Sequence, residues 1–216
     1  MGAYQDFHRR SIQERDAFWA EQAKLIDWHT PHTQVCNFDC PPFANWFVQG
    51  KTNLCHNAID RHLAERGDQK ALIYISTETG QEKSYTYRDL YKEVNRAAGM
   101  LATLGVRRGD RVLIYMPMIA EAVFAMLACA RIGAIHSVVF GGFASASLAT
   151  RIDDARPALM ITADAGMRGG KAIPYKHLVD EALRLAKHPP RHVIVVNRGI
   201  DKDYQPVAGQ IGRAHV

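Results

Sequence analysis

The sequence predicts an α/β fold: a mostly parallel sheet covered by helices on both faces, preceded by helices and a β-hairpin. Four short β-rich runs alternate with helical patterns of about 10–15 residues, which is the sequence sign of a parallel sheet. The run 112–116 is wholly apolar, as expected for a strand that is covered on both faces. The four predicted strands are residues 111–116, 134–140, 158–164 and 192–196.

Residues 1–66 are expected to form an N-terminal helical and wrapping segment. Residues 5–24 carry apolar side chains at helical spacing between charges. Residues 27–50 are rich in proline and aromatic residues, so we expect a loop-like stretch that pins itself to a surface by aromatic burial. A further helix is expected from Thr52 to Glu65, with a polar residue as its N-cap and Gly67 as its stop.

Residues 67–200 are expected to form the α/β subdomain. It begins with two β-rich runs, residues 71–76 and 83–87, and Gly80 between them suits the turn of a hairpin. A long amphipathic helix is then predicted over residues 87–104, because its apolar positions fall on one face.

Helices are expected in each connection between the sheet strands. Residues 121–131 are rich in Ala, Met and Leu, so they predict a buried crossover helix that Gly133 ends. Residues 145–155 and 175–187 predict the other two helices. Residues 201–216 are short of apolar periodicity and are expected to form an irregular tail.

Composition and charge exclude several classes of protein. The chain is 47% hydrophobic and 23% charged, which is ordinary for a soluble globular domain. The net charge of +5 is spread along the chain, whereas nucleic-acid binders cluster their Lys and Arg. No apolar run approaches the roughly 20 residues of a membrane span. The N-terminus is polar and mixed in charge, so we expect no signal peptide, a cytoplasmic location, and neither nucleic acid nor membrane as a partner.

The four cysteines do not form a recognisable metal motif. Cys36 and Cys40 are followed by a lone Cys55-His56 pair, which is a loose match to the spacing of structural zinc sites. Cys129 lies in the predicted buried helix and is expected to pack as a small apolar residue. We therefore expect unrelated reduced thiols and no metal.

Two loops are the first place to look for a ligand. Residues 140–145 and 164–174 follow predicted strands, and ligands of open α/β sheets bind beyond the carboxyl ends of the strands. If the two strands are neighbours, both loops face one crevice. The first loop offers glycine backbone that a ligand can approach and an aromatic surface for a base. The second offers Arg168, Lys171 and glycine amides, which can hold phosphate. The alternative, that these cations belong to a solvated surface loop, stays equally open on chemistry alone.

Common nucleotide and catalytic motifs are absent. Residues 166–172 (GMRGGKA) are one residue short of the GxxxxGK[ST] phosphate loop and lack its hydroxyl. No GxGxxG follows a predicted strand, which argues against a dinucleotide dehydrogenase. His136 lies within a predicted strand and is interpreted as a core histidine rather than a general base.

Three long blocks carry a resemblance to a known family. Residues 52–63 (TNLCHNAIDRHL), 105–157 and 161–176 (ITADAGMRGGKAIPYK) closely resemble the AMP-forming short-chain acyl-CoA synthetases, which are adenylate-forming enzymes. The resemblance extends from about residue 5 to about residue 200. It implies the first subdomain of that family's large N-terminal domain. It also implies two half-reactions: a carboxylate and ATP form an acyl-adenylate, and the CoA thiol then takes the acyl group.

The resemblance implies a site for the nucleotide end of CoA. The phenylalanine and glycines after the VV strand and the Arg-x-x-Arg/Lys loop hold this part of CoA in the family. By position, the expected CoA-binding residues here are Phe140, Gly141, Gly142, Arg168, Gly169, Gly170, Lys171, Ile173 and Pro174. Lys171 stands where acetate enzymes usually have Arg, which keeps the charge and loses the bidentate geometry.

The resemblance also implies what this chain lacks. The family's adenylate-forming loop, its adenine-binding motif and its catalytic lysine are absent, so no catalytic or metal-binding residue is expected. ATP, CoA and Mg²⁺ are implied for an intact enzyme, whereas the chain alone is expected to be inactive and to require none of them. The sequences PPFANWF (41–47) and TNLCHN (52–57) favour propionate over acetate as the carboxylate. A hypothesis of another class is a non-catalytic module that binds CoA or a nucleotide.

Overall fold

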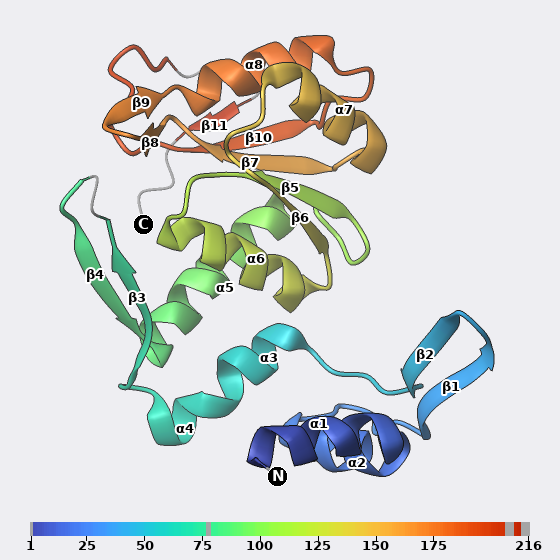
Figure 1. Cartoon of the computed structure of the whole chain (residues 1–216). Coiled ribbons are helices and arrows are strands. Elements are labelled where there is room, and N and C mark those ends of the chain that lie inside the picture. Colours follow the sequence, from blue (N-terminus) through green and yellow to red (C-terminus); the bar gives the residue numbers. More distant parts are fainter. Residues whose placement is uncertain (1, 77–78, 206–209, 213–216) are drawn as a thin grey trace. The chain divides into compact units, whose positions relative to one another are not determined.

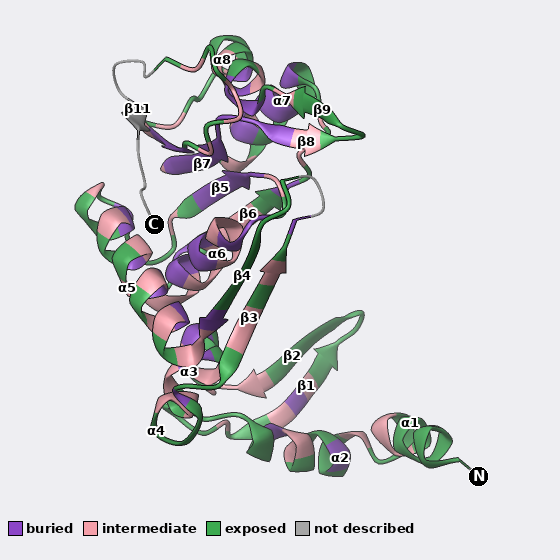
Figure 2. Cartoon of the chain, turned by 90° about the vertical axis from the view of Figure 1, so that its left-hand side faces the viewer, coloured by how far each residue is buried: buried purple, intermediate pink, exposed green. Residues whose placement is uncertain are grey.

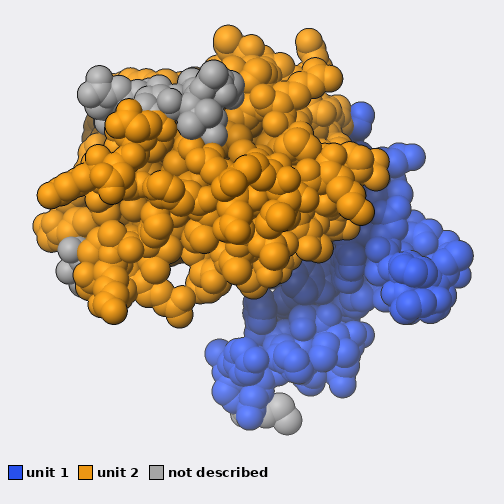
Figure 3. Space-filling view, turned by 90° about the horizontal axis from the view of Figure 1, so that it is seen from above, with its two compact units in different colours: residues 1–57 blue, residues 58–216 orange. Residues whose placement is uncertain are grey.

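The computed structural model describes residues 2–76, 79–205 and 210–212. The chain forms two compact units, residues 1–57 and 58–216, which Figure 3 colours separately. This division falls earlier in the chain than the boundary at 66/67 expected from the sequence. Each unit is described by itself.

The first unit pairs helices with an antiparallel hairpin. Its elements are α1 (Ala3–Gln13), α2 (Arg15–Gln22), a 3₁₀ turn (Ala23–Leu25), β1 (Gln34–Cys40), β2 (Phe43–Val48) and the start of α3 (Leu54–Ala58). The expectation of a loop over residues 27–50 is wrong for most of that range, because β1 and β2 pair there. Two of the three prolines that suggested a loop, Pro41 and Pro42, occupy the turn between the strands.

Aromatic side chains of this unit contact one another, but several of those in the hairpin stay exposed. Trp19 and Trp46 approach at 5.9 Å between ring centroids, and Trp28 and Phe47 at 5.4 Å. Trp46 is 42% exposed and Phe43 is 79% exposed. The expectation of pinning by aromatic burial is therefore wrong for the hairpin.

The second unit contains the predicted parallel sheet. Its strands lie in the order β11-β10-β7-β5-β6, and every neighbouring pair is parallel. The strands are β5 (Arg111–Tyr115), β6 (Ile135–Val139), β7 (Leu159–Ala163), β10 (His192–Val196) and β11 (Gln210–Gly212). All four predicted strands are present. The fifth, β11, lies in the segment expected to be irregular, and three residues are too few to show a strand period.

Helices cover both faces of this sheet, as predicted (Figure 1). Helices α5 (Tyr87–Thr103) and α6 (Ala120–Ile132) pack on one face, and α7 (Ser145–Ala155) and α8 (Tyr175–Leu185) on the other. The buried residues follow the central strands and the sides of the helices that face them (Figure 2). Gly133 ends α6 in the left-handed conformation, with φ of 74°.

The predicted hairpin joins the sheet through a capped helix. Strands β3 (Lys70–Ile75) and β4 (Glu82–Thr86) are antiparallel. Thr86 caps α5: its Oγ1 accepts from the backbone N–H of Asp89 at 3.1 Å, and its own N–H donates to the Asp89 carboxylate at 3.1 Å.

The single helix expected from Thr52 to Glu65 is broken. It consists of α3, a 3₁₀ turn (Asp60–His62) and α4 (Leu63–Arg66). The break falls at Ile59, whose φ of −129° lies outside the helical range and whose side chain is fully buried.

Candidate functional site

The order of the strands places a topological switch point at β5. The chain leaves β5 for β6 on one side and then returns across it to β7 on the other. Ligands of open α/β sheets bind beyond the carboxyl ends of the strands at such a point. A shared crevice was expected if the strands before the two candidate loops, β6 and β7, are neighbours. They are not neighbours, because β5 lies between them. Their loops still flank the same carboxyl edge.

A hollow of about 740 Å³ lies at this edge. Five of the predicted CoA-binding residues line it: Phe140, Gly141, Gly142, Arg168 and Ile173. Gly169, Gly170, Lys171 and Pro174 do not line it. Most of the remaining lining is apolar and comes from the ends of β3, β5 and β6. The structure thus gathers residues from segments far apart in sequence around one concave surface.

The predicted cationic loop is a hairpin. Strands β8 (Gly166–Arg168) and β9 (Lys171–Ile173) are antiparallel and join through Gly169 and Gly170. Both glycines have positive φ, 55° and 74°, which a two-residue type I′ turn requires. Arg168 pairs directly with Lys171, so the two exposed cations lie on the same face of the hairpin. The turn explains the glycine pair without any ligand.

The glycines after β6 lie against aromatic rings. A Cβ on Gly142 would lie 2.4 Å from a ring carbon of Phe140, and one on Gly141 would lie 2.1 Å from the Tyr175 hydroxyl. The Phe140 ring is 67% exposed and meets Phe143 edge-on at 5.9 Å between centroids. An aromatic face is therefore presented beside the hollow.

A third cation at this edge was missed by the sequence reasoning. Arg198 follows β10 and lines the hollow. Its Nη1 donates to the carbonyl oxygen of Ala165 at 3.0 Å. The fully buried Asp164 accepts from the backbone N–H of Arg198 at 3.0 Å and of Ile200 at 3.0 Å, which holds this loop. A basic residue at the end of an apolar strand was the only available signal.

Two buried tyrosines beneath the loops were also missed. Tyr115 ends β5 and Tyr175 begins α8, and their rings lie 5.1 Å apart. Burial raises the pKa of Tyr115 to about 12, so its hydroxyl remains a donor at neutral pH. In the sequence, both residues stand out only as apolar positions of a predicted strand and helix.

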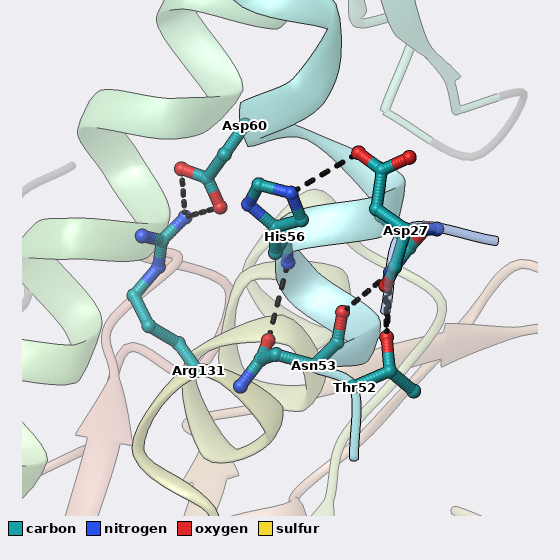
Figure 4. Close-up of polar contacts among 7 residues, drawn as sticks. Asp27, Thr52, Asn53, His56, Asp60 and Arg131 are labelled. Atoms are coloured by element: carbon teal, nitrogen blue, oxygen red, sulfur yellow. Dashed lines mark hydrogen bonds and ion pairs between the residues drawn. The ribbon is translucent and has the colours of Figure 1, made fainter. Parts of the chain in front are cut away.

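The polar residues of the block 52–63 stabilise local structure (Figure 4). In the first unit, Thr52 Oγ1 donates to the Asp27 carbonyl oxygen at 2.7 Å, and His56 Nε2 lies 3.3 Å from Asp27 Oδ2. In the second unit, Arg131 Nη2 lies 3.0 Å from each carboxylate oxygen of Asp60. None of these contacts belongs to the hollow.

No metal centre or membrane span is found in the part of the chain that the structure describes. No three His, Cys, Asp or Glu side chains gather there. Cys36, Cys55 and Cys129 are buried and Cys40 is exposed, and none of the four forms a disulfide. His136, interpreted as a core histidine, is only half-buried on the edge strand β6. No helix among the described residues is long and apolar enough to cross a bilayer.

Comparison with known protein families shows which family the chain belongs to. The chain belongs to the AMP-binding enzyme family, whose model matches residues 59–213. A second model, the acetyl-coenzyme A synthetase N-terminus, matches residues 4–58. The α/β prediction and the resemblance to acyl-CoA synthetases are thereby confirmed.

Individual proteins similar to this chain include two acyl-CoA ligases known by sequence and one solved structure. The chain is 61% identical over 200 residues to the propionate–CoA ligase of Escherichia coli K12. The aligned region makes up 93% of this chain and 32% of the relative. It is 46% identical over 198 residues to the mitochondrial acyl-CoA synthetase short-chain family member 3 of Bos taurus. This aligned region makes up 91% of the chain and 29% of the relative. The solved acetoacetyl-CoA synthetase of Streptomyces lividans superposes with a TM-score of 0.87 at 30% identity, over 98% of this chain and 32% of that one. The chain thus spans about a third of the length of its relatives.

Proposed function

We propose that the chain is the CoA-binding part of an AMP-forming acyl-CoA synthetase that acts on propionate in the cytoplasm. The observation that carries this proposal is the 61% identity to a propionate–CoA ligase over nearly the whole chain. Acetyl-coenzyme A synthetases are also similar, at 49% identity for that of Xanthobacter autotrophicus, which makes acetate the second candidate acid. We propose residues 1–66 and 67–200 as the segments of this part, followed by the tail 201–216.

The chemistry consists of two half-reactions. A propionate oxygen attacks the α-phosphorus of ATP, which forms propionyl-adenylate and releases pyrophosphate. The CoA thiolate then attacks the acyl carbon, which forms propionyl-CoA and releases AMP. The second step breaks the mixed anhydride bond and forms a thioester bond, so no redox step is required.

The geometry at the carboxyl edge supports binding of the CoA nucleotide. Arg168 and Lys171 offer two positive charges on one hairpin face, and CoA carries a phosphorylated ribose and a diphosphate. The exposed ring of Phe140 offers a surface on which adenine can stack. We assign the phosphates to the cations and the base to the phenylalanine, with Gly141, Gly142, Ile173 and Pro174 as backbone and packing contacts.

We assign ATP and Mg²⁺ to residues outside this chain. Among the described residues no carboxylate cluster forms that a divalent cation would need, and no glycine-rich phosphate loop follows a strand. The metal would neutralise phosphate charge during adenylation. The chain alone is therefore proposed to be inactive, with no catalytic residue of its own.

Isotope exchange tests the reaction and its acid. The full translated product of the gene should exchange labelled pyrophosphate into ATP when propionate is present, and less efficiently with acetate. Better exchange with acetate would make acetate the proposed substrate. Absence of exchange with either acid, together with CoA binding, would favour the non-catalytic module.

Calorimetry tests the CoA site directly on the 216-residue chain. Arg168→Ala should weaken CoA binding about tenfold at low salt, because a charge-assisted phosphate contact is lost. Arg96→Ala is the matched control, since Arg96 lies on α5 and its side chain is 63% exposed. A flat trace for the unaltered chain would contradict the proposed site.

A further inference from the structure

Tyr175 lies against two glycine-containing segments at once. It is the first residue of α8 and is only 8% exposed. A Cβ on Gly141 would lie 2.1 Å from its hydroxyl oxygen, and a Cβ on Gly166 would lie 3.0 Å from its ring carbon Cζ. Real Cβ atoms essentially never approach as closely as 2.1 Å, and a contact at 3.0 Å is unusually tight, so the absence of side chains lets both backbones pack closely on this ring. The ring therefore sets the distance between the loop after β6 and the start of β8.

Tyr115 supports the same loop through its hydroxyl. It is fully buried at the end of β5, and its ring contacts Tyr175 at 5.1 Å between centroids. Its Oη donates to the carbonyl oxygen of Phe143 at 2.9 Å, and the carbonyl oxygen of Gly141 lies 3.4 Å away. A buried phenol stabilises its surroundings when its hydroxyl finds such a partner. The Phe143 carbonyl of the 140–143 loop is thus attached to a central strand, and the Gly141 carbonyl lies beside the same hydroxyl.

The loop held in this way carries the exposed ring of Phe140. That ring packs over the position where Gly142 would carry a Cβ, at 2.4 Å, and contacts Phe143 edge-on. Its direction is therefore a consequence of the backbone between residues 140 and 143. Arg151 lies over the other aromatic ring of the loop, Phe143, at 4.5 Å.

We infer that Tyr115 and Tyr175 are positioning residues that hold the 140–143 loop in the conformation that binds the CoA nucleotide. The inference rests on the proposed function, because it takes Phe140 as a CoA contact. Neither tyrosine needs to touch CoA: each acts through the loop backbone. The effect should appear in the CoA half-reaction alone, since adenylation does not use CoA.

Tyr115→Phe is the primary test, in the full translated product of the gene. The variant keeps the ring and its packing and loses only the hydroxyl that attaches the loop. We expect the KM for CoA to rise about threefold to tenfold, the change that corresponds to one hydrogen bond. The kcat and the rate of pyrophosphate exchange should stay unchanged. Tyr91→Phe is the control, because Tyr91 lies on α5, and thermal unfolding followed by circular dichroism checks the fold of each variant.

A double-variant cycle tests Tyr175. Gly141→Ala should raise the KM for CoA, because the new methyl group meets the Tyr175 hydroxyl. Tyr175→Leu removes that hydroxyl and the ring carbon behind it, so the double variant should bind CoA better than the two separate effects predict. Such coupling in the KM for CoA is not expected of two residues that serve only overall stability.

The outcomes separate this inference from the function on which it depends. Unaltered protein that neither exchanges pyrophosphate nor binds CoA would overturn the proposed function. Normal exchange with an unchanged KM for CoA in Tyr115→Phe would overturn the positioning role. So would a parallel loss of exchange and CoA turnover, which would indicate a general structural role.

Discussion

Arg168 and Lys171 face each other across the Gly169-Gly170 turn as a directly opposed pair of β8 and β9. Two like charges at adjacent cross-strand positions repel each other. An anion placed between them removes that cost, which is a physical reason for a phosphate site at this hairpin. The charges are 2 of 27 Lys and Arg residues in the chain, so it is their pairing that distinguishes the proposed phosphate site.

The identity of the second cation should tune CoA affinity. Lys171→Arg should tighten CoA binding about twofold to fivefold, because guanidinium can make two hydrogen bonds to a phosphate where ammonium supplies a point charge. Lys171→Met should weaken binding about tenfold. Calorimetric titration of the 216-residue chain with CoA measures both. Equal affinities for Lys, Arg and Met at this position would remove Lys171 from the site.

The turn glycines should be required for the shape of the hairpin. Gly170 has φ of 74°, and no neighbouring atom lies within 4 Å of the place that a methyl group would occupy, so Gly170→Ala tests backbone conformation alone. We expect a loss of about 1–2 kcal/mol in the stability of the turn, seen as faster amide exchange in β8 and β9, together with weaker CoA binding. Gly99→Ala in α5 is the control, because its methyl position is also open and a helix favours alanine. Unchanged exchange in Gly170→Ala would show that the turn tolerates a side chain.

The ion pair between Asp60 and Arg131 should contribute measurably to stability. Each side chain is only 21% exposed, and Nη2 lies 3.0 Å from both carboxylate oxygens. Asp60→Asn should lower the free energy of unfolding by about 1–3 kcal/mol, since a partly buried guanidinium loses its charged acceptor. Asp68→Asn should cost less than about 0.5 kcal/mol, because its pair with Arg88 is largely exposed, at 87% and 51%. Urea unfolding compares the two, and equal losses would contradict the ranking.

Alkaline pH should destabilise the second unit through Tyr115. Burial raises the pKa of this phenol from 10.0 to about 12 in the folded state. Its contribution to stability is therefore fully present below about pH 10 and is lost as pH rises from about 10 through about 12. Urea unfolding across this range should show a decline that is smaller in Tyr115→Phe. The same slope in both proteins would assign the decline to other groups.

The thiols should differ widely in reactivity. Cys40 is exposed, whereas Cys129 is fully buried and its burial raises the pKa of the thiol to about 12. Brief treatment of folded protein with iodoacetamide should modify Cys40 first and leave Cys129 unmodified, as peptide mass spectrometry can determine. Treatment in urea should modify all four cysteines. Early modification of Cys129 in folded protein would show that α6 opens readily.

The elements of the second unit could be predicted from sequence because their signals are local. The apolar run 112–116 and the glycine stop at Gly133 each lie within a few residues. The hairpin at 34–48 and the break at Ile59 were missed, since prolines obscured the strands and the break depends on burial of one side chain.

The sequence by itself determined the fold class, the family and the residues that offer charge and aromatic surface at the carboxyl edge. Only the tertiary structure decided how these residues meet. It placed β5 between the two loop-bearing strands, made the glycine-rich loop a hairpin, and brought Tyr115 and Tyr175 beneath Gly141. The physical reason is that strand order and side-chain contact depend on pairings across many residues of chain, whereas strand and helix patterns depend on neighbours.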